Sequence, residues 1–228
     1  MCMHNLSIPV QPMTMWPTYM FVTKYRDWPF DKKEILSAVD AEVSKQTTDI
    51  ESKVAENVKT PGLKEGDFDF LKKQDTYPVL AKLESFFKEA VKDVVTNGIP
   101  KADPKFILNI DVETTITDCW YHKTNNGGAH GVHAHPGSSW SGIFYVNTTD
   151  CDVATHNGIN RFHNVASVTS VGDVGSMWWS GFSSVEIAPL EGHLVLFPGW
   201  MYHEATAFTG SKDRVVISFN SVTNKIGG

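Results

Sequence analysis

The sequence is poor in the features that mark secreted or membrane-spanning chains. It has three cysteines among 228 residues, Cys2, Cys119 and Cys151, an odd number at wide spacing. A disulfide framework or a zinc–thiolate site is therefore not expected. No apolar run reaches the roughly 18–20 residues of a membrane span. The first sixteen residues, "MCMHNLSIPVQPMTMW", lack the basic and then apolar pattern of a signal peptide. We therefore expect a cytoplasmic protein.

Clustered positive charge is also missing. The 20 basic residues are outnumbered by 26 acidic ones, the net charge is −6, and no lysine- or arginine-rich block occurs. Such a chain is not expected to bind nucleic acid. A hydrophobic share of 41% over 228 residues is enough for a substantial core. We therefore expect residues 1–228 to form a single domain. We expect neither a nucleic-acid nor a membrane partner, and the protein could form a homodimer.

The first 105 residues mix strand and helix patterns. Residues 14–25, "TMWPTYMFVTKY", predict one or two strands. Residues 31–43, "DKKEILSAVDAEV", predict a helix that Asp31 caps. Residues 44–75 are polar and predict a loop with a short helical turn.

A second helix is predicted over residues 79–96. Its apolar side chains recur with helical spacing, so that Leu83, Phe87 and Val91 share one face. Gly98 and Pro100 follow, which predicts that the helix ends there. A helix with one apolar face needs a surface to cover, and we expect that surface to be a sheet.

From residue 106 to about 222 the pattern changes to strands. Short β-branched and aromatic segments alternate with turn residues. They are "FILNIDVETTITDCWYH", "SSWSGIFYVN", "SSVEIAPL", "GHLVLFP" and "RVVISFNSV". This spacing predicts a mainly β fold with flanking helices, a cupin-like jelly roll or double-stranded β-helix. Residues 1–105 then supply N-terminal strands and buttressing helices.

Two histidines occupy alternate positions, His133 and His135, just before Pro136. Alternate residues of an extended segment share a face, and proline favours an extended conformation at the preceding residue. Two imidazoles on one face can bind one metal ion at about 2.1 Å. The pair alone is weak evidence, because solvent-exposed histidines are common.

A third histidine and an arginine lie further along the chain. His203 comes seventy residues after His133, and Arg214 follows it by eleven. In the strand that Arg214 begins, Ser218 shares its face, and an arginine with a hydroxyl can bind a carboxylate. A surface arginine on an edge strand is the alternative. If the three histidines bind one metal, we expect His133 and His203 to face each other across the barrel mouth.

Together these segments resemble a known family. "HAHPGSSWSGIFYV", "GHLVLFPGWMYHEA" and "DRVVISFN", with Trp120 before them, are similar to a family of 2-oxoglutarate/Fe(II) oxygenases of bacteria and phages. The resemblance spans about residues 106–222. It implies a double-stranded β-helix, Fe(II) as cofactor, and 2-oxoglutarate as a co-substrate that is converted to succinate and CO2. A cytoplasmic enzyme of a bacterial or phage-infected cell would follow.

The resemblance also assigns roles to residues. His133 and His203 correspond to iron ligands, and His135 stands where the wider superfamily has Asp or Glu. Arg214 corresponds to the residue that binds the distal carboxylate of 2-oxoglutarate. Many members have Arg-x-Ser, but position 216 here is valine, so Ser218 and Tyr145 are the remaining hydroxyl candidates. Three further residues stay open as metal-site partners: His130, Asp150 and Asp152.

The substrate is not specified by the sequence. A small molecule or a peptidyl side chain is expected to be hydroxylated, and Trp178 and Trp179 are candidates for stacking on it. Two other functions remain open. One is a cupin-like metal enzyme with three histidines that does not use 2-oxoglutarate. The other is a non-catalytic jelly-roll module, either a binding protein or a virion-associated one.

Overall fold

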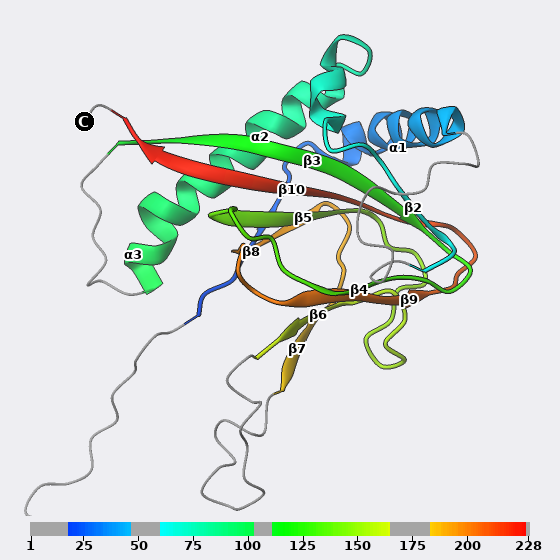
Figure 1. The fold of residues 1–228 in the computed structure, drawn as a ribbon. Coiled ribbons are helices and arrows are strands. Elements are labelled where there is room, and N and C mark those ends of the chain that lie inside the picture. Colours follow the sequence, from blue (N-terminus) through cyan, green and yellow to red (C-terminus); the bar gives the residue numbers. More distant parts are fainter. Residues whose placement is uncertain (1–17, 47–59, 103–110, 165–182, 227–228) are drawn as a thin grey trace, which may run out of the picture.

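Two antiparallel sheets and a layer of helices make up the structure, a computed structural model that describes residues 18–46, 60–102, 111–164 and 183–226. The helices lie on the outer face of the larger sheet, and the smaller sheet lies on its other side (Figure 1). The fold is a jelly roll, as the strand pattern predicted. Trp178 and Trp179 fall outside the described residues.

The larger sheet has six strands in the order β1-β8-β5-β10-β3-β2, all paired antiparallel. Its strands, in chain order, are β1 (Phe21–Lys24), β2 (Leu63–Glu65), β3 (Val112–Thr124), β5 (Trp140–Asn147), β8 (His193–Pro198) and β10 (Arg214–Lys225). All eight residues of β5 are buried, because helices cover one face of this central strand and the smaller sheet covers the other.

The smaller sheet has four strands in the order β4-β9-β6-β7. They are β4 (Gly128–His133), β6 (Asn160–His163), β7 (Ser184–Ile187) and β9 (His203–Phe208). Strands β2, β4, β6 and β9 were not predicted as strands. Each is short, and β4 and β9 carry histidine or glycine at positions where an apolar–polar alternation would be expected.

The helical layer differs from the prediction at its boundaries. The helices are α1 (Trp28–Lys45), the 3-10 segment η1 (Phe70–Asp75), α2 (Val79–Asp93), the π-turn η2 (Val94–Gly98) and α3 (Ile99–Ala102). The predicted cap at Asp31 is wrong, because α1 begins at Trp28 with Pro29 in its first turn, a position that suits proline. The predicted end at Gly98 and Pro100 is also wrong, since α3 continues through Pro100.

Helix α2 packs on the larger sheet through the face that its sequence predicted. Leu83, Phe87 and Val91 are fully buried in the main hydrophobic core. The ring of Phe87 stacks on Phe219 of β10, with 4.5 Å between ring centroids. The opposite face of the sheet forms a second apolar cluster with the smaller sheet, and the candidate site opens between these two sheets.

Candidate metal and co-substrate site

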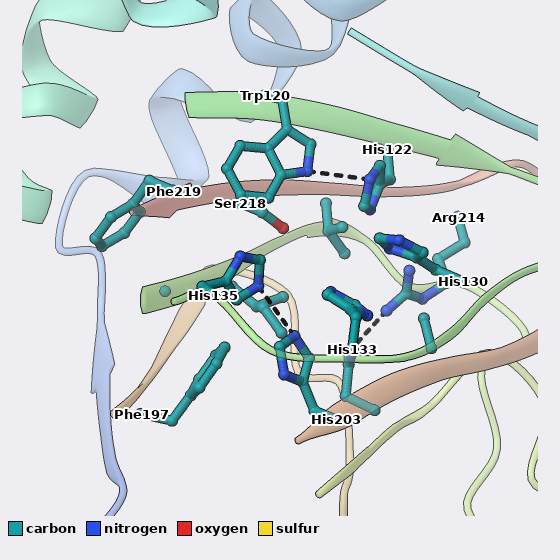
Figure 2. A pocket seen from close by; sticks show the side chains of 15 residues that line it. Trp120, His122, His130, His133, His135, Phe197, His203, Arg214, Ser218 and Phe219 are labelled. Atoms are coloured by element: carbon teal, nitrogen blue, oxygen red, sulfur yellow. Dashed lines mark hydrogen bonds between the residues drawn. The ribbon is translucent and has the colours of Figure 1, made fainter. Parts of the chain in front are cut away.

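A pocket between the two sheets collects the residues that the sequence singled out. Strands β4 and β9 of the smaller sheet contribute His133 and His203, and β10 of the larger sheet contributes Arg214 and Ser218 (Figure 2). His135 comes from the loop that follows β4. Its backbone amide donates to the Gly199 carbonyl at 2.7 Å, which joins this loop to the turn before His203.

Three histidines form one potential metal-binding group. The ligand nitrogens of His133, His135 and His203 all lie within 4.8 Å of one another, and this is the one such group among the described residues. The Nε2 atoms of His135 and His203 are 3.3 Å apart. Two nitrogens bound to one ion at about 2.1 Å, with angles of roughly 90–110°, would be about 3.0–3.4 Å apart. The donor spacing therefore fits a single divalent ion.

Hydrogen bonds set the tautomers of two of these rings. Nδ1 of His133 lies 2.7 Å from the Gly131 carbonyl, and Nδ1 of His203 lies 3.0 Å from the Met201 carbonyl. A carbonyl only accepts, so each Nδ1 carries the proton and donates it. Nε2 of each neutral ring then has the lone pair that a metal requires, the arrangement in which metal-ligating histidines usually occur.

Burial keeps two of the rings uncharged. Burial lowers the pKa of His203 to about 2, and the neighbouring His133 lowers it further than the Met201 carbonyl can offset. Burial, followed by the charges of His133 and His122, lowers the pKa of His135 to about 4. Both imidazoles are therefore neutral at pH 7, the form that binds a metal.

The relative position of His133 and His203 differs from the prediction. They do not face each other across the barrel mouth, because they are direct cross-strand partners on β4 and β9 of the same sheet. Directly opposed residues in an antiparallel pair have Cα atoms roughly 4.5–5.5 Å apart. The two rings meet with 4.3 Å between their centroids, so convergence on one ion is retained.

The carboxylate alternatives lie away from this group. Asp150 accepts hydrogen bonds from Ser211, and Asp152 accepts from Thr155 and from the amide of Ala154. Neither lines the pocket. His130 does line it and stacks on His133 at 4.0 Å between centroids, but it is not part of the three-histidine group.

One pocket residue was given no role from the sequence. His122 lines the pocket, and its Nε2 lies 2.7 Å from Glu65 and 3.1 Å from the indole nitrogen of Trp120. On β3 it stands directly opposite Val216 of β10. Because residues alternate between the two faces of a strand, the sequence could have placed His122 on the same face of β3 as Trp120. Nothing in the sequence indicates that His122 contacts the distant Glu65.

Arg214 is the most deeply buried cation of the site. It is 2% exposed, and its Nε donates to the Gly158 carbonyl at 2.7 Å while Nη2 donates to Oδ1 of Asn160 at 2.9 Å. Within the described ranges it forms no ion pair with a carboxylate. A buried charge without a counter-ion is costly. The site is therefore suited to bind an anion from solution.

The two hydroxyl candidates occupy different places. Ser218 lines the pocket opposite Trp120, on the far side from Arg214 in Figure 2. Ser218 comes four positions after Arg214 along β10, roughly 13 Å of strand. Tyr145 does not line the pocket. It is fully buried, and its hydroxyl donates to Oδ1 of Asn160 at 3.1 Å, the same oxygen that accepts from Arg214.

Residues 118–220 match the model of the family described as "Putative 2OG-Fe(II) oxygenase". This range contains every residue that lines the pocket. This stretch of the chain is therefore similar to 2OG-Fe(II) oxygenases, and the match covers just under half of the chain.

Solved structures support the fold. A prolyl hydroxylase from Trichoplax adhaerens, in complex with a peptide fragment of the hypoxia inducible factor oxygen degradation domain, has a TM-score of 0.56 and 13% identity over 88% of this chain and 82% of that one. OsALKBH1 has a TM-score of 0.52 and 10% identity over 92% and 99%. No curated protein matches the sequence.

A third solved structure matches over a shorter range. It is an oxidoreductase of the 2OG-Fe(II) oxygenase family from Burkholderia pseudomallei, with a TM-score of 0.37 and 14% identity over 58% of this chain. The chain spans only 56% of the length of that protein. As for the membrane, no helix among the described residues is both long and apolar enough to cross it.

Proposed function

We propose that the chain hydroxylates a peptidyl or small-molecule substrate, with His133, His135 and His203 holding Fe(II) and Arg214 binding 2-oxoglutarate. When bound, iron and 2-oxoglutarate supply the oxidation, which converts the co-substrate to succinate and CO2. A soluble enzyme of the cytoplasm and a homodimer remain part of the proposal. The observation that carries it is the combination of three converging imidazoles and a buried arginine that lacks a carboxylate partner within the described residues.

Different residues of the pocket would bind the metal, bind the co-substrate and exclude water. The three imidazoles are neutral or held in one tautomer, so they can bind a divalent ion without first losing protons. Arg214 would form charge-assisted hydrogen bonds to the distal carboxylate. Ser218 would line the wall between the metal and substrate sides, and Tyr145 would act through Asn160 rather than by direct contact. The apolar walls at Phe197 and Val216 would exclude water.

A three-histidine enzyme that does not use 2-oxoglutarate is the competing function, and Arg214 discriminates between the two. The experiment is turnover of 2-oxoglutarate to succinate by the iron-loaded protein, uncoupled when no substrate is added. Arg214→Ala should raise the apparent constant for 2-oxoglutarate roughly 10- to 100-fold, because a hydrogen bond to a charged group contributes about 1.5–3 kcal/mol. Arg214→Lys should restore only part of this, since lysine has no bidentate fork.

Iron binding in both variants should match the wild type, because Arg214 is not a ligand. Equal dependence on 2-oxoglutarate in all three proteins would remove Arg214 from the site and favour the three-histidine alternative. Absence of succinate from every protein, including the wild type with iron bound, would contradict the oxygenase mechanism itself.

A further inference from the structure

Among the described residues, the hydrogen-bond partners of Arg214 are neutral acceptors. Its Nε donates to a backbone carbonyl, that of Gly158, and its Nη2 donates to a side-chain amide oxygen, that of Asn160. Gly158 has φ +65°, and a Cβ there would lie 2.4 Å from the ring of Phe208. A glycine is therefore required to aim this carbonyl at the guanidinium.

The other two groups near Arg214 are also uncharged. The thiol of Cys151 interacts with Arg214, and burial raises the pKa of Cys151 more than the arginine lowers it. Burial likewise raises the pKa of Tyr145 far above neutral pH. The guanidinium thus keeps its positive charge, while two of its five N–H groups donate to neutral oxygens.

Asn160 is the centre of this arrangement. It is 3% exposed on β6 and lines the pocket. Its Oδ1 accepts from both Arg214, at 2.9 Å, and the hydroxyl of Tyr145, at 3.1 Å, while its Nδ2 donates to the carbonyl of Glu204 at 3.4 Å. Because two donors contact Oδ1 and a carbonyl acceptor contacts Nδ2, the orientation of the Asn160 amide is fixed.

We propose that Asn160 is a specificity-determining residue of the co-substrate site, which holds Arg214 through a neutral oxygen so that its charge remains available to a dicarboxylic 2-oxo acid. The inference rests on the proposed function. An aspartate has nearly the same shape and would accept the same two hydrogen bonds. It would, however, form an internal ion pair with Arg214 and cancel the charge that attracts the ligand's distal carboxylate.

The inference distinguishes two classes of ligand. A 2-oxo acid with a second carboxylate, such as 2-oxoglutarate, uses both the metal and Arg214. A monocarboxylic 2-oxo acid, such as 2-oxobutyrate, has the same chelating end but no second carboxylate that could bind Arg214. A change at Asn160 that acts through the charge of Arg214 should therefore weaken binding of the first and leave the second unchanged.

The test compares Asn160→Asp with Asn126→Asp, which makes the same charge change at an exposed turn residue. Dissociation constants for 2-oxoglutarate and for 2-oxobutyrate are measured on the Fe(II)-loaded protein under anaerobic conditions. Asn160→Asp should weaken 2-oxoglutarate roughly 10- to 100-fold, as expected for a lost charge-assisted interaction. Binding of 2-oxobutyrate and of Fe(II) should stay within about threefold of the wild type, and Asn126→Asp should change nothing.

Thermal stability separates this role from a purely structural one. The new carboxylate would pair with a buried cation but would lose the hydrogen bond from Nδ2 to the Glu204 carbonyl, so Asn160→Asp should unfold close to the wild-type temperature. A second variant, Tyr145→Phe, removes one donor from Oδ1 without adding charge, and it should weaken 2-oxoglutarate by about threefold while sparing 2-oxobutyrate.

Two results would overturn the inference. One is wild-type affinity for 2-oxoglutarate in Asn160→Asp, and the other is an equal loss of both ligands in Asn160→Asp and Tyr145→Phe. In either case the wild-type protein would still bind 2-oxoglutarate, so the proposed function would stand. If the wild type itself fails to bind 2-oxoglutarate, the proposed function fails and this inference with it.

Discussion

The Nε2 atoms of His135 and His203 face each other at 3.3 Å, although 68 positions separate the residues in the chain. The proton of His203 is held at Nδ1 by the Met201 carbonyl, so a lone pair on Nε2 points toward His135. Without an ion, this lone pair can accept a hydrogen bond from Nε2 of a neutral His135, and with an ion both nitrogens can bind it. In the proposed function these two nitrogens, together with a nitrogen of His133, hold the metal ion.

Removing one ligand should remove the metal. His203→Ala should abolish stoichiometric Fe(II) binding, because two imidazoles cannot compete with water for a labile divalent ion. The measurement is anaerobic iron titration of the purified protein, with circular dichroism to show that the fold persists. His163→Ala, on the outward side of the neighbouring strand β6, is the control and should bind iron normally. Iron bound at wild-type affinity by His203→Ala would remove that residue from the ligand set.

A carboxylate should be able to replace the third imidazole. The resemblance in sequence aligns His135 with an Asp or Glu of the wider superfamily, so we expect His135→Asp to retain Fe(II) within about tenfold of wild-type affinity. His135→Ala should lose it. Loss of iron by both variants to the same extent would show that the backbone at residue 135 is placed for an imidazole alone, since the shorter aspartate would then fall short of the ion.

The three histidines that come together were predictable from the sequence, but their arrangement was not. His133 and His135 stand out through alternation, and Pro136 indicates an extended backbone. That His203 pairs directly with His133 depends on the register of two short strands, and neither strand carries a pattern that specifies it. The same holds for Asn160, Gly158 and Glu65, which reach the site through pairings with no local signal.

For the helices, the sequence predicted which face packs on the sheet but not where each helix ends. The apolar spacing of residues 79–96 was enough to place Leu83, Phe87 and Val91 against the sheet. The ends of the helices were misplaced, because Asp31 and Pro100 each suit several positions near a helix start and tertiary contacts decide which is used. Asp31, for example, accepts hydrogen bonds from Tyr25 at 2.7 Å and Lys82 at 2.9 Å rather than capping α1.

The packing of α2 on the sheet should carry much of the stability. Phe87 is fully buried and stacks on Phe219, so Phe87→Ala should cost about 3–5 kcal/mol of the free energy of unfolding. Phe30→Ala is the matched control, because Phe30 is 83% exposed and its loss should change stability by less than about 0.5 kcal/mol. Urea denaturation of the two variants measures the difference. Equal stabilities would show that α2 is not a structural support of the jelly roll.

Stability should fall in acid through Glu42 of α1. Burial raises the pKa of Glu42, but hydrogen bonds from Lys45 at 2.6 Å, Lys73 at 2.5 Å and Tyr77 at 2.8 Å outweigh it and lower the pKa to about 2. A carboxylate with a depressed pKa contributes stability above its unfolded value of 4.5, and the contribution is lost as the pH falls toward 2.

The variant Glu42→Gln should therefore be destabilised by about 2 kcal/mol at pH 7 and should approach the wild type near pH 2. Urea denaturation of the metal-free protein at pH 7, 5 and 3 follows the difference, with Glu89→Gln on the exposed face of α2 as the control. A constant gap between Glu42→Gln and the wild type at all three pH values would contradict a role for the ionised carboxylate.

The most direct test of the metal and co-substrate site is the charge-transfer absorption of a 2-oxo acid chelated to Fe(II), recorded without oxygen. The wild type should develop this band on addition of 2-oxoglutarate and saturate at one iron per chain. His203→Ala should show no band, and Arg214→Lys should show it only at roughly 10-fold higher 2-oxoglutarate. A wild-type protein that binds iron but never develops the band, or a band that survives unchanged in His203→Ala, would contradict the account.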